Sequence, residues 1–384
     1  MSEAATRFVS PLTFQSLTGR PVYTTLWGAL DAPPDGQASA VLPTHVVHVG
    51  LAEAADLMVI APATANTLAK LAHGLADNLL TTLALAARCP LLLAPAMDVE
   101  MWAHTATQAN VATLRERGAH FAGPASGRMA SGLEGAGRMV EPLELLGHVR
   151  LVLGYTGPLS GQHVVVTAGP TREAIDPVRF ISNPSSGRQG FALAQAALDR
   201  GARVTLIAGP THLTPPVGAQ YISIHTAQEI KTAVLDATAQ ADLLLMAAAV
   251  ADYRPQEQAP QKIKKSEANL TLELTRTPDV LSAVAVRWAE TRYPRLVVGF
   301  AAESQDLLEN ARQKLGTKNM DLVIANDITA PDAGFATTTN QVTIINREGD
   351  TTQLPLMSKE AVAAAILDHI TPLLLESTGG HQDA

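Results

Sequence analysis

The chain has 384 residues, which is long enough for two or three domains with separate hydrophobic cores. Hydrophobic residues make up 47% and charged residues 17% of a chain with net charge −8, a globular composition that disfavours general binding of nucleic acid. The single cysteine, Cys89, excludes an internal disulfide and a multi-cysteine metal site, and it predicts a reducing, cytoplasmic location.

Apolar runs of strand length alternate with helical patterns through the first half of the chain. The apolar stretch 79–97 is interrupted by Arg88 and Pro90, so it predicts a helix, a turn and a strand rather than a membrane span. The alternation indicates parallel strands joined by crossover helices. Strands are expected over 56–62 and 90–95, and helices over 64–75, 78–88 and 105–117.

Residues 123–139 are rich in Gly and Ser and predict an irregular, mobile flap. A helix over 142–153 then leads to a Gly/Pro-containing boundary, so we expect one domain over 1–158 and a second over 159–384. The sequence begins without the strand and glycine turn that normally open a doubly wound sheet. The first domain is therefore expected to lack one βα unit, roughly 30 residues.

The second half repeats the α/β scheme. Its strands are expected over 164–168, 203–208, 242–248, 296–301, 321–325 and 341–346. The first of these strands is followed by Gly169-Pro170, a polar loop containing Asn183, and a helix from about Ser186, which is an anion-binding arrangement. Residues 254–269 form a long polar loop that we expect to be functional. The predicted fold is two three-layer α/β domains with mainly parallel sheets and helices on both faces.

Charged and amide side chains follow the strands of the second half. Lysines suit phosphate groups as point charges, although a short lysine run is often only a solvated surface. Asp252 lies just beyond a predicted strand, where it could bind Mg²⁺ together with phosphates or cap a helix. The lysines concerned are Lys262, Lys264, Lys265, Lys314 and Lys318.

Seven motifs occur in order along the chain: APATAN (61–66), PAMDVEMW (95–102), TAGPTRE (167–173), VRFISNPSSGRQG (178–190), AAAVADY (247–253), KIKK (262–265) and GFAAE (299–303). This set resembles the bifunctional bacterial enzymes of coenzyme A biosynthesis. The resemblance implies a flavodoxin-like flavoprotein domain and a Rossmann-like ligase domain. It also implies that a ligase couples 4'-phosphopantothenate to cysteine with CTP and Mg²⁺, and that an FMN-dependent decarboxylase then forms 4'-phosphopantetheine.

For the ligase, the resemblance implies a role for Asn183 in holding the acyl-cytidylate, and a role for Arg179 in binding the phosphate or carboxylate of the pantothenate. Asp252 would contact CTP and the metal. The reaction needs positioning and charge stabilisation rather than a covalent nucleophile. The implied nucleotide contacts are Met246, Ala247, Ala248, Lys262, Pro278, Asp279, Val280, Leu281, Phe300, Lys314 and Lys318.

For the decarboxylase, the resemblance implies that His48 is a general base, with His45 as a nearby alternative. Flavin would bind at Ala63, Thr64, Asn66 and Met97, with Met101 in the same pocket.

Two positions depart from the best-known family pattern, which has Asn at Asp98 and Cys at Ser131. An ionised aspartate would repel a substrate carboxylate unless it were buried and protonated. A serine hydroxyl is a much weaker acid than a thiol, so another proton donor or water could be required.

Three hypotheses follow. The first is the bifunctional enzyme, a homo-oligomer built from ligase dimers and decarboxylase trimers, with no nucleic-acid or membrane partner. The second is a ligase alone, with a degenerate flavoprotein domain kept for assembly. The third is a dehydrogenase or a nucleotide-binding regulator. A dehydrogenase is disfavoured because no GxGxxG motif joins a strand to a helix. A regulator is disfavoured because KIKK, Asp252 and Asn183 are more than binding alone would need.

Overall fold

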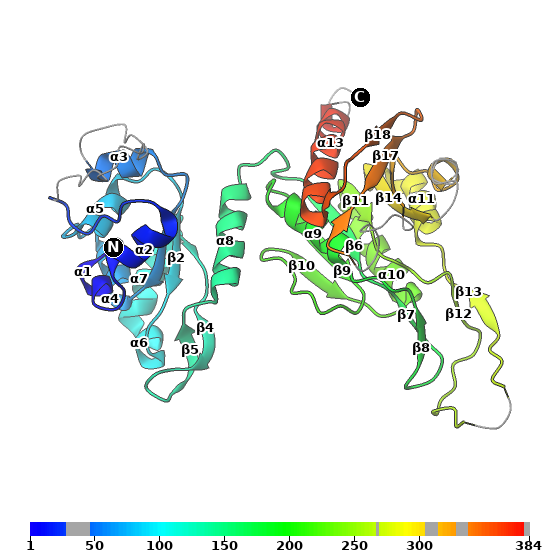
Figure 1. Cartoon of the computed structure of the whole chain (residues 1–384), viewed down its shortest axis with the longest axis horizontal. Coiled ribbons are helices and arrows are strands. Elements are labelled where there is room, and N and C mark those ends of the chain that lie inside the picture. Colours follow the sequence, from blue (N-terminus) through cyan, green and yellow to red (C-terminus); the bar gives the residue numbers. More distant parts are fainter. Residues whose placement is uncertain (28–46, 266–268, 304–313, 328–336, 380–384) are drawn as a thin grey trace. The chain divides into compact units, whose positions relative to one another are not determined.

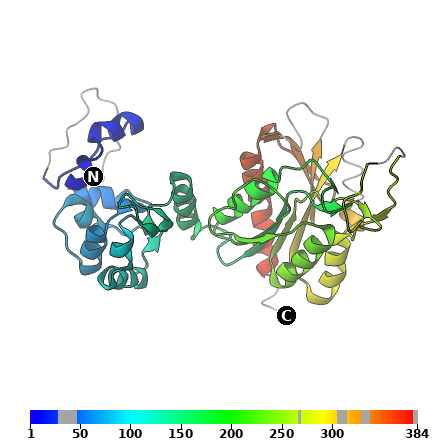
Figure 2. The same ribbon diagram turned by 90° about the horizontal axis from the view of Figure 1, so that it is seen from below.

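A computed structural model describes residues 1–27, 47–265, 269–303, 314–327 and 337–379. The chain forms two compact units, Met1–Leu153 and Gly154–Ala384. In each unit, helices surround a mainly parallel sheet (Figures 1 and 2). The predicted α/β class is therefore confirmed. None of the described helices combines the length and the apolar character needed to cross a membrane.

The described part of the first unit has a parallel sheet in the order β1-β2-β3. The strands are β1 (Met58–Ala63), β2 (Leu91–Pro95) and β3 (His120–Phe121), and Ile60 pairs with Leu93. The prediction missed β3 because two residues are too few to show a period. The prediction of an absent opening βα unit stays a prediction, since residues 28–46 lie outside the described residues.

Local signals set the helix bounds in this unit. For α4, Thr64 is the N-cap and Gly74 ends the helix in a left-handed conformation, while Leu68 and Ala72 are buried on one face. The helices are α1 (Glu3–Thr6), α2 (Pro11–Thr18), α3 (Val47–Glu53), α4 (Ala65–His73), α5 (Leu79–Ala86), α6 (Val99–Ala103), α7 (Thr105–Glu116) and α8 (Pro142–Gly154).

The glycine-rich segment 123–139 is more regular than predicted. It forms an antiparallel hairpin of β4 (Ala125–Arg128) and β5 (Glu134–Arg138). A Cβ atom on Gly137 would lie 2.4 Å from the carbonyl oxygen of Met97, and one on Gly135 would lie 3.0 Å from Val99. The glycines of β5 therefore allow the hairpin to pack closely against the start of α6.

The second unit has an eight-stranded sheet in the order β10-β9-β6-β11-β14-β15-β17-β18. Strands β10 to β15 in this order are parallel, and β17 and β18 are antiparallel. The two outermost strands have only four and three residues. The bounds are β6 (His163–Ala168), β9 (Arg203–Ala208), β10 (Gln220–Ser223), β11 (Leu243–Met246), β14 (Leu296–Glu303), β15 (Leu322–Asp327), β17 (Val342–Asn346) and β18 (Thr351–Gln353).

Helices cover both faces of this sheet. On one face, Val165 and Leu244 of the sheet belong to a buried core with residues of α10 (Ala227–Ala237) and α11 (Val280–Thr291). Helix α9 (Arg188–Leu198) contacts both β6 and α13 (Lys359–Gly379), beside which it lies in Figure 1. Gly190 permits the close approach of α9, because a Cβ atom there would lie 2.5 Å from Ala168 Cβ.

Small antiparallel pairs extend from the carboxyl edge of the large sheet (Figure 1). The hairpin of β7 (Arg172–Ala174) and β8 (Phe180–Ser182) leads directly into Asn183. Strand β12 (Tyr253–Pro255) pairs with β13 (Leu274–Arg276) and contacts β7. The predicted long loop therefore joins β12 to β13. A further pair is formed by β16 (Thr339–Asn340) and β19 (Met357–Ser358).

Candidate functional site

A cavity of 820 Å³ opens at the carboxyl ends of the parallel strands of the second unit. It brings together residues from the segment after β8, from β11, β14 and α11, and from the segment 314–320. Arg179, Lys262 and Pro278, which the sequence also predicted, do not line it. Predicted residues that do line it are Asn183, Met246, Ala247, Ala248, Asp252, Asp279, Val280, Leu281, Phe300, Lys314 and Lys318.

The chain after β11 is held by hydrogen bonds to β11 itself, to the Thr167 side chain of β6 and to Gly169 just after β6. The N–H groups of Ala247, Ala248 and Ala249 donate to Leu245 O (3.2 Å), Thr167 Oγ1 (3.1 Å) and Gly169 O (2.9 Å). These three amides are consequently used within the protein. This strand end can offer a ligand carbonyl oxygens, which accept hydrogen bonds, but not these N–H groups.

Asn183 lies between two cavities. It shares the wall of the 820 Å³ cavity with a neighbouring cavity of 640 Å³, which also contains Arg172, Arg188 and His212. Its Nδ2 donates to Ala249 O at 3.3 Å and to Val250 O at 3.1 Å. Both amide hydrogens are thus directed to the backbone, and Oδ1 is the atom left to accept a hydrogen bond from a ligand.

Lys318 provides a cation on the cavity wall. Its Nζ forms an ion pair with Asp279 and bonds Ser282 Oγ at 3.2 Å. Burial acts to raise the pKa of Asp279, but the hydrogen bonds from Lys318 and Ser282 outweigh it and hold this pKa below its usual value. Lys314, four residues earlier, is exposed. An anionic ligand can therefore contact one partly buried and one exposed lysine.

Three further cations of this cavity, Arg188, Arg276 and Lys359, were missed by the sequence analysis. Lys359 is only 4% exposed at the start of α13, and it lies near Arg188 at the start of α9. Burial and the charge of Arg188 lower the pKa of the Lys359 ammonium group. No local motif marks Lys359, because it lies in a different element far along the chain from Asn183.

Asn326, at the end of β15, also lines the cavity. Its Oδ1 is a buried acceptor without a hydrogen-bond partner in the structure. Such an atom is costly to leave unpaired, so it favours a ligand that donates a hydrogen bond there.

Asp252 is exposed at the cavity wall. The described residues contain no cluster of three or more His, Cys, Asp or Glu side chains arranged for a metal. Mg²⁺ usually takes one or two carboxylates and completes its shell with phosphates and water. Asp252 therefore fits a magnesium ion that arrives with a nucleotide.

Arg179 and Lys262 lie outside the cavity lining. The guanidinium group of Arg179 pairs with Asp176 and donates to Ile263 O at 2.8 Å. Lys262, next to Ile263, is exposed. The structure thus places both residues at the long loop rather than on the cavity wall.

In the first unit, the two positions that depart from the family pattern contact one another. The Ser131 hydroxyl, in the turn between β4 and β5, donates a hydrogen bond to Asp98 Oδ2. Asp98 also caps α6 through the N–H of Glu100 at 3.3 Å. Met97 N donates to Gly137 O at 2.9 Å, which holds β5 against the same segment. The hairpin is therefore closed over the start of α6.

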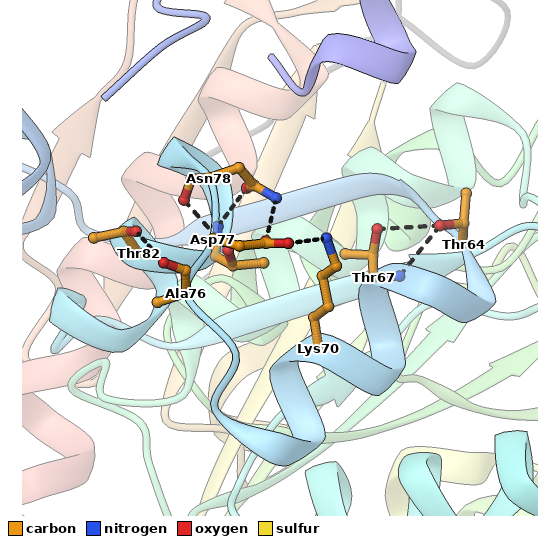
Figure 3. Close-up of polar contacts among 8 residues, drawn as sticks. Thr64, Thr67, Lys70, Ala76, Asp77, Asn78 and Thr82 are labelled. Carbon is orange, nitrogen blue, oxygen red and sulfur yellow. Dashed lines mark hydrogen bonds and ion pairs between the residues drawn. The ribbon is translucent and has the colours of Figure 1, made fainter. Parts of the chain in front are cut away.

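The predicted flavin-binding residues lie at the carboxyl end of β1, beside the end of β2. Ala63 is buried and pairs with Pro95, whereas Thr64 and Asn66 are exposed. In Figure 3, Thr64 and Thr67 lie on the same helix as Lys70, whose Nζ bonds Asp77 Oδ2 at 2.6 Å. At the carboxyl end of β1, Thr64 offers a hydroxyl and Asn66 an amide to a polar ligand, whereas the Lys70–Asp77 ion pair lies further along the chain.

Three other predicted residues of this unit are more scattered. Met97 is partly buried, while Met101 is 50% exposed. His48 lies on α3, at the other end of the unit from α6 and the β4–β5 hairpin (Figure 1). A single chain therefore does not bring His48 together with Asp98 and Ser131. His45 lies outside the described residues.

Comparisons with known proteins match both halves of the chain. The family described as "Flavoprotein" matches residues 1–153, and "DNA/pantothenate metabolism flavoprotein C-terminal domain" matches residues 159–374. The coenzyme A biosynthesis bifunctional protein CoaBC of Bacillus subtilis is 44% identical over 97% of this chain and 89% of its own length. A cysteine/cysteine sulfinic acid decarboxylase of an unknown prokaryotic organism is 42% identical over 95% of this chain and 99% of its own length. A crystal structure of the C-terminal domain of a CoaBC protein aligns with 57% of this chain and 99% of that domain, at 37% identity and a TM-score of 0.48.

Proposed function

The chain belongs to the family of coenzyme A biosynthesis bifunctional proteins, and from this premise we propose that it catalyses two consecutive steps. Residues 159–384 couple 4'-phosphopantothenate to cysteine with CTP, through an acyl-cytidylate. Residues 1–158 then decarboxylate phosphopantothenoylcysteine to 4'-phosphopantetheine with FMN. The observation that carries the ligase assignment is the single cavity lined by Asn183, Asp252, Lys314 and Lys318.

The cavity suits a reaction between a nucleoside triphosphate and a carboxylic acid. Both reactants are anionic, so their approach requires cations, and Lys314, Lys318 and Lys359 supply them. The neighbouring cavity, with Arg172 and Arg188, provides space and charge for the phosphorylated acid. Asn183, on the wall shared by both cavities, then lies where the two substrates meet.

The hydrogen-bonding groups of the cavity suggest how the nucleotide is oriented. The strand end at Ala247 and Ala248, together with Asn326 Oδ1, offers acceptors, which suit the amino group of a base or the hydroxyls of a ribose. The lysines suit the phosphates. Asn183 Oδ1 is also an acceptor, so it suits the attacking amine of cysteine better than the acyl phosphate oxygens.

Mg²⁺ would be held by Asp252 together with the phosphates of the nucleotide. The ion would neutralise charge on the leaving pyrophosphate. The exposed carboxylate of Asp252 at the cavity wall supports this assignment.

FMN would bind at the edge formed by Ala63, Thr64 and Asn66, close to Met97. When bound, it supplies a two-electron acceptor and donor for the decarboxylation. The residues of this chain orient the substrate: Asp98 and Ser131 close the hairpin over the site, and His48 acts as the base. The hydrogen bond from Ser131 would reduce the negative charge that Asp98 presents to the substrate.

We expect a homo-oligomer in which decarboxylase units form trimers and ligase units form dimers. The separation of His48 from Asp98 within one chain supports a site completed by a neighbouring copy. Phe8, Leu12 and Leu17 are 88%, 66% and 80% exposed and give this unit apolar surface for such contacts. Light scattering measures the number of copies, and a monomer would contradict this assembly.

A coupled assay tests both steps. The chain is incubated with 4'-phosphopantothenate, cysteine, Mg²⁺ and either CTP or ATP, and pyrophosphate and CO₂ are measured separately. We expect cysteine-dependent pyrophosphate release with CTP, which Asn183→Ala and Lys262→Ala abolish while Lys231→Ala does not. Near-normal turnover of both site variants would overturn the ligase assignment.

The alternative is a chain that carries out ligation alone. The replacement of the family's Asn and Cys by Asp98 and Ser131 favours this alternative. Visible absorbance of bound flavin after reconstitution, followed by CO₂ release, separates the two functions. Pyrophosphate release without flavin binding or CO₂ would support the ligase-only function.

A further inference from the structure

The lysine segment, Lys262–Lys265, is fastened to the turn of the β7–β8 hairpin. Ile263 N donates to Asp176 Oδ2 at 3.1 Å, and Ile263 O accepts from Arg179 Nη2 at 2.8 Å. Nearer to β12, Ala259 N donates to Ile175 O at 3.0 Å. The same hairpin ends at Asn183, so one element holds the lysine segment and leads into the cavity wall.

Both carboxylate oxygens of Asp176 accept hydrogen bonds from within the protein. Its side chain has 0% exposure. Oδ1 accepts from the N–H groups of Val178 (2.8 Å) and Arg179 (2.9 Å), and Oδ2 accepts from the Arg179 guanidinium group and from Ile263 N. The Arg179 side chain, with these backbone donors, holds the pKa of Asp176 well below its usual range. A charged carboxylate with every oxygen bonded has no capacity left for a substrate.

The loop has few other attachments. Within its described residues 256–265, Gln256 N donates to Glu273 O just before β13, and Ala259 and Ile263 bond to the β7–β8 turn. Lys262 and Lys264 flank Ile263 in the sequence and are exposed. Fixing the backbone at Ile263 therefore restricts where both ammonium groups can reach.

We propose that Asp176 and Arg179 are positioning residues that hold the lysine segment ready for the phosphates of the nucleotide. The proposal rests on the proposed ligase function for its consequence, but not for the contact itself. Arg179 acts through Ile263 rather than on the substrate. The entropic cost of ordering the segment is then incurred when the chain folds. The free energy of nucleotide binding is therefore not reduced by that cost.

Limited trypsin digestion tests the contact without any activity. Trypsin cleaves after Lys262, Lys264 and Lys265, and mass spectrometry measures each cleavage rate. Asp176→Asn and Arg179→Gln should raise these rates at least about tenfold, because charged hydrogen bonds hold the segment closed and cleavage follows the open population. Unchanged rates in both variants would overturn the proposal.

The hydrogen bonds that join Asp176 and Arg179 to Ile263 are called the anchor. A matched control separates loss of the anchor from general loosening of the hairpin. Glu173 is also buried on β7, but its Oε1 accepts from Ala227 N at 2.8 Å and makes no contact with the lysine segment. Glu173→Gln should therefore leave cleavage at the three lysines within about twofold of the original chain. Equal increases in Glu173→Gln and Asp176→Asn would overturn the proposal.

A second pair of variants leaves both side chains of the anchor in place. Ile263→Pro removes the N–H group that bonds Asp176, whereas Ile263→Ala keeps it. Trypsin does not cut between lysine and proline, so only cleavage after Lys264 and Lys265 is compared. Faster cleavage there in the proline variant, with the alanine variant unchanged, supports the anchor even if Asp176→Asn fails to fold. Equal cleavage in the two variants contradicts it.

Ligase kinetics test the positioning role. Asp176→Asn and Arg179→Gln should raise KM for CTP at least about tenfold and change kcat less, and Arg179→Lys should recover part of the loss. Faster cleavage with unchanged KM would overturn the positioning role. If the original chain has no ligase activity, the proposed function fails, while the trypsin result still decides whether the anchor exists.

Discussion

Reverting Asp98 and Ser131 to the residues of the family pattern, singly and together, tests whether the hydrogen-bonded pair acts as a unit. Asp98→Asn leaves an amide beside the serine hydroxyl, and Ser131→Cys leaves a thiol beside the carboxylate. In each single variant, one member of the pair is replaced, and the other member is the one that forms the hydrogen bond in the original chain. The double variant contains the Asn and Cys of the family pattern.

The structure sets the expected size of the effect. A hydrogen bond to a charged acceptor contributes about 1.5–3 kcal/mol, and exposure of Ser131 reduces this, so we expect a coupling energy of about 1 kcal/mol. In kcat/KM this corresponds to roughly fivefold. Each single variant should be slower than the original chain, and the double variant should be faster than the product of the single effects predicts.

The assay is CO₂ release from phosphopantothenoylcysteine by the flavin-reconstituted chain, at substrate concentrations well below KM. Thermal unfolding of all four proteins serves as the control for misfolding, and flavin absorbance corrects for cofactor content. Effects that add within about 0.3 kcal/mol would refute the reasoning, because independent residues give additive changes.

Three further predictions concern the second unit. Lys318→Met should raise KM for CTP by about tenfold with a smaller change in kcat, since it removes a charge that faces phosphates, whereas Lys231→Met on α10 should have no effect on pyrophosphate release. Asp176 has a lowered pKa in the folded chain, so its stabilisation is present above the unfolded value of about 4 and is lost as pH falls further. Urea unfolding from pH 6 to pH 3 should therefore show a smaller loss of stability for Asp176→Asn than for the original chain, and parallel curves would contradict this. Asn326→Leu should leave the melting temperature unchanged or raise it, because it removes an unpaired buried acceptor, yet reduce the thermal shift caused by CTP; an undiminished shift would argue against a ligand contact there.

The position of the ligase cavity follows from rules that act on local sequence. Continuous apolar runs such as 164–168 mark buried parallel strands, and polar residues just after them must collect at one edge of the sheet. Asp252 lines the cavity for this reason, shortly after β11, whereas Asn183 reaches it from the end of the β7–β8 hairpin and Lys318 from the segment before β15. Their catalytic and binding roles remain predictions that the experiments above address.

Other features depend on contacts between distant segments and leave no local pattern. Asp176 contacts Ile263 across 87 positions, and Lys359 joins the cavity from the start of the last helix. Lys262 and Arg179 were expected at the cavity, but the pairing of Arg179 with Asp176 and Ile263 keeps it at the loop instead. Side-chain pairing of this kind is decided by tertiary packing rather than by periodicity.

The glycine-rich hairpin shows how composition can mislead. A segment containing five glycines between residues 123 and 137 has a loop-like composition, yet alternate glycines of β5 provide the flat face that packs against Val99 and Met97. Because Gly135 and Gly137 have no side chains, the hairpin can lie close to Met97 and Val99. Only the partner surface, which lies 36 to 40 residues earlier in the chain, distinguishes this role from a loop.

The short outer strands of the large sheet also limit how copies of this protein can associate. Strand β10 exposes an edge of four residues and β18 an edge of three, and all three residues of β18 are solvent-exposed and polar. A neighbouring chain would find little backbone there to extend the sheet. Growth into fibres by strand addition is thereby disfavoured, so crowding many copies together should favour contacts through helices and hairpins instead.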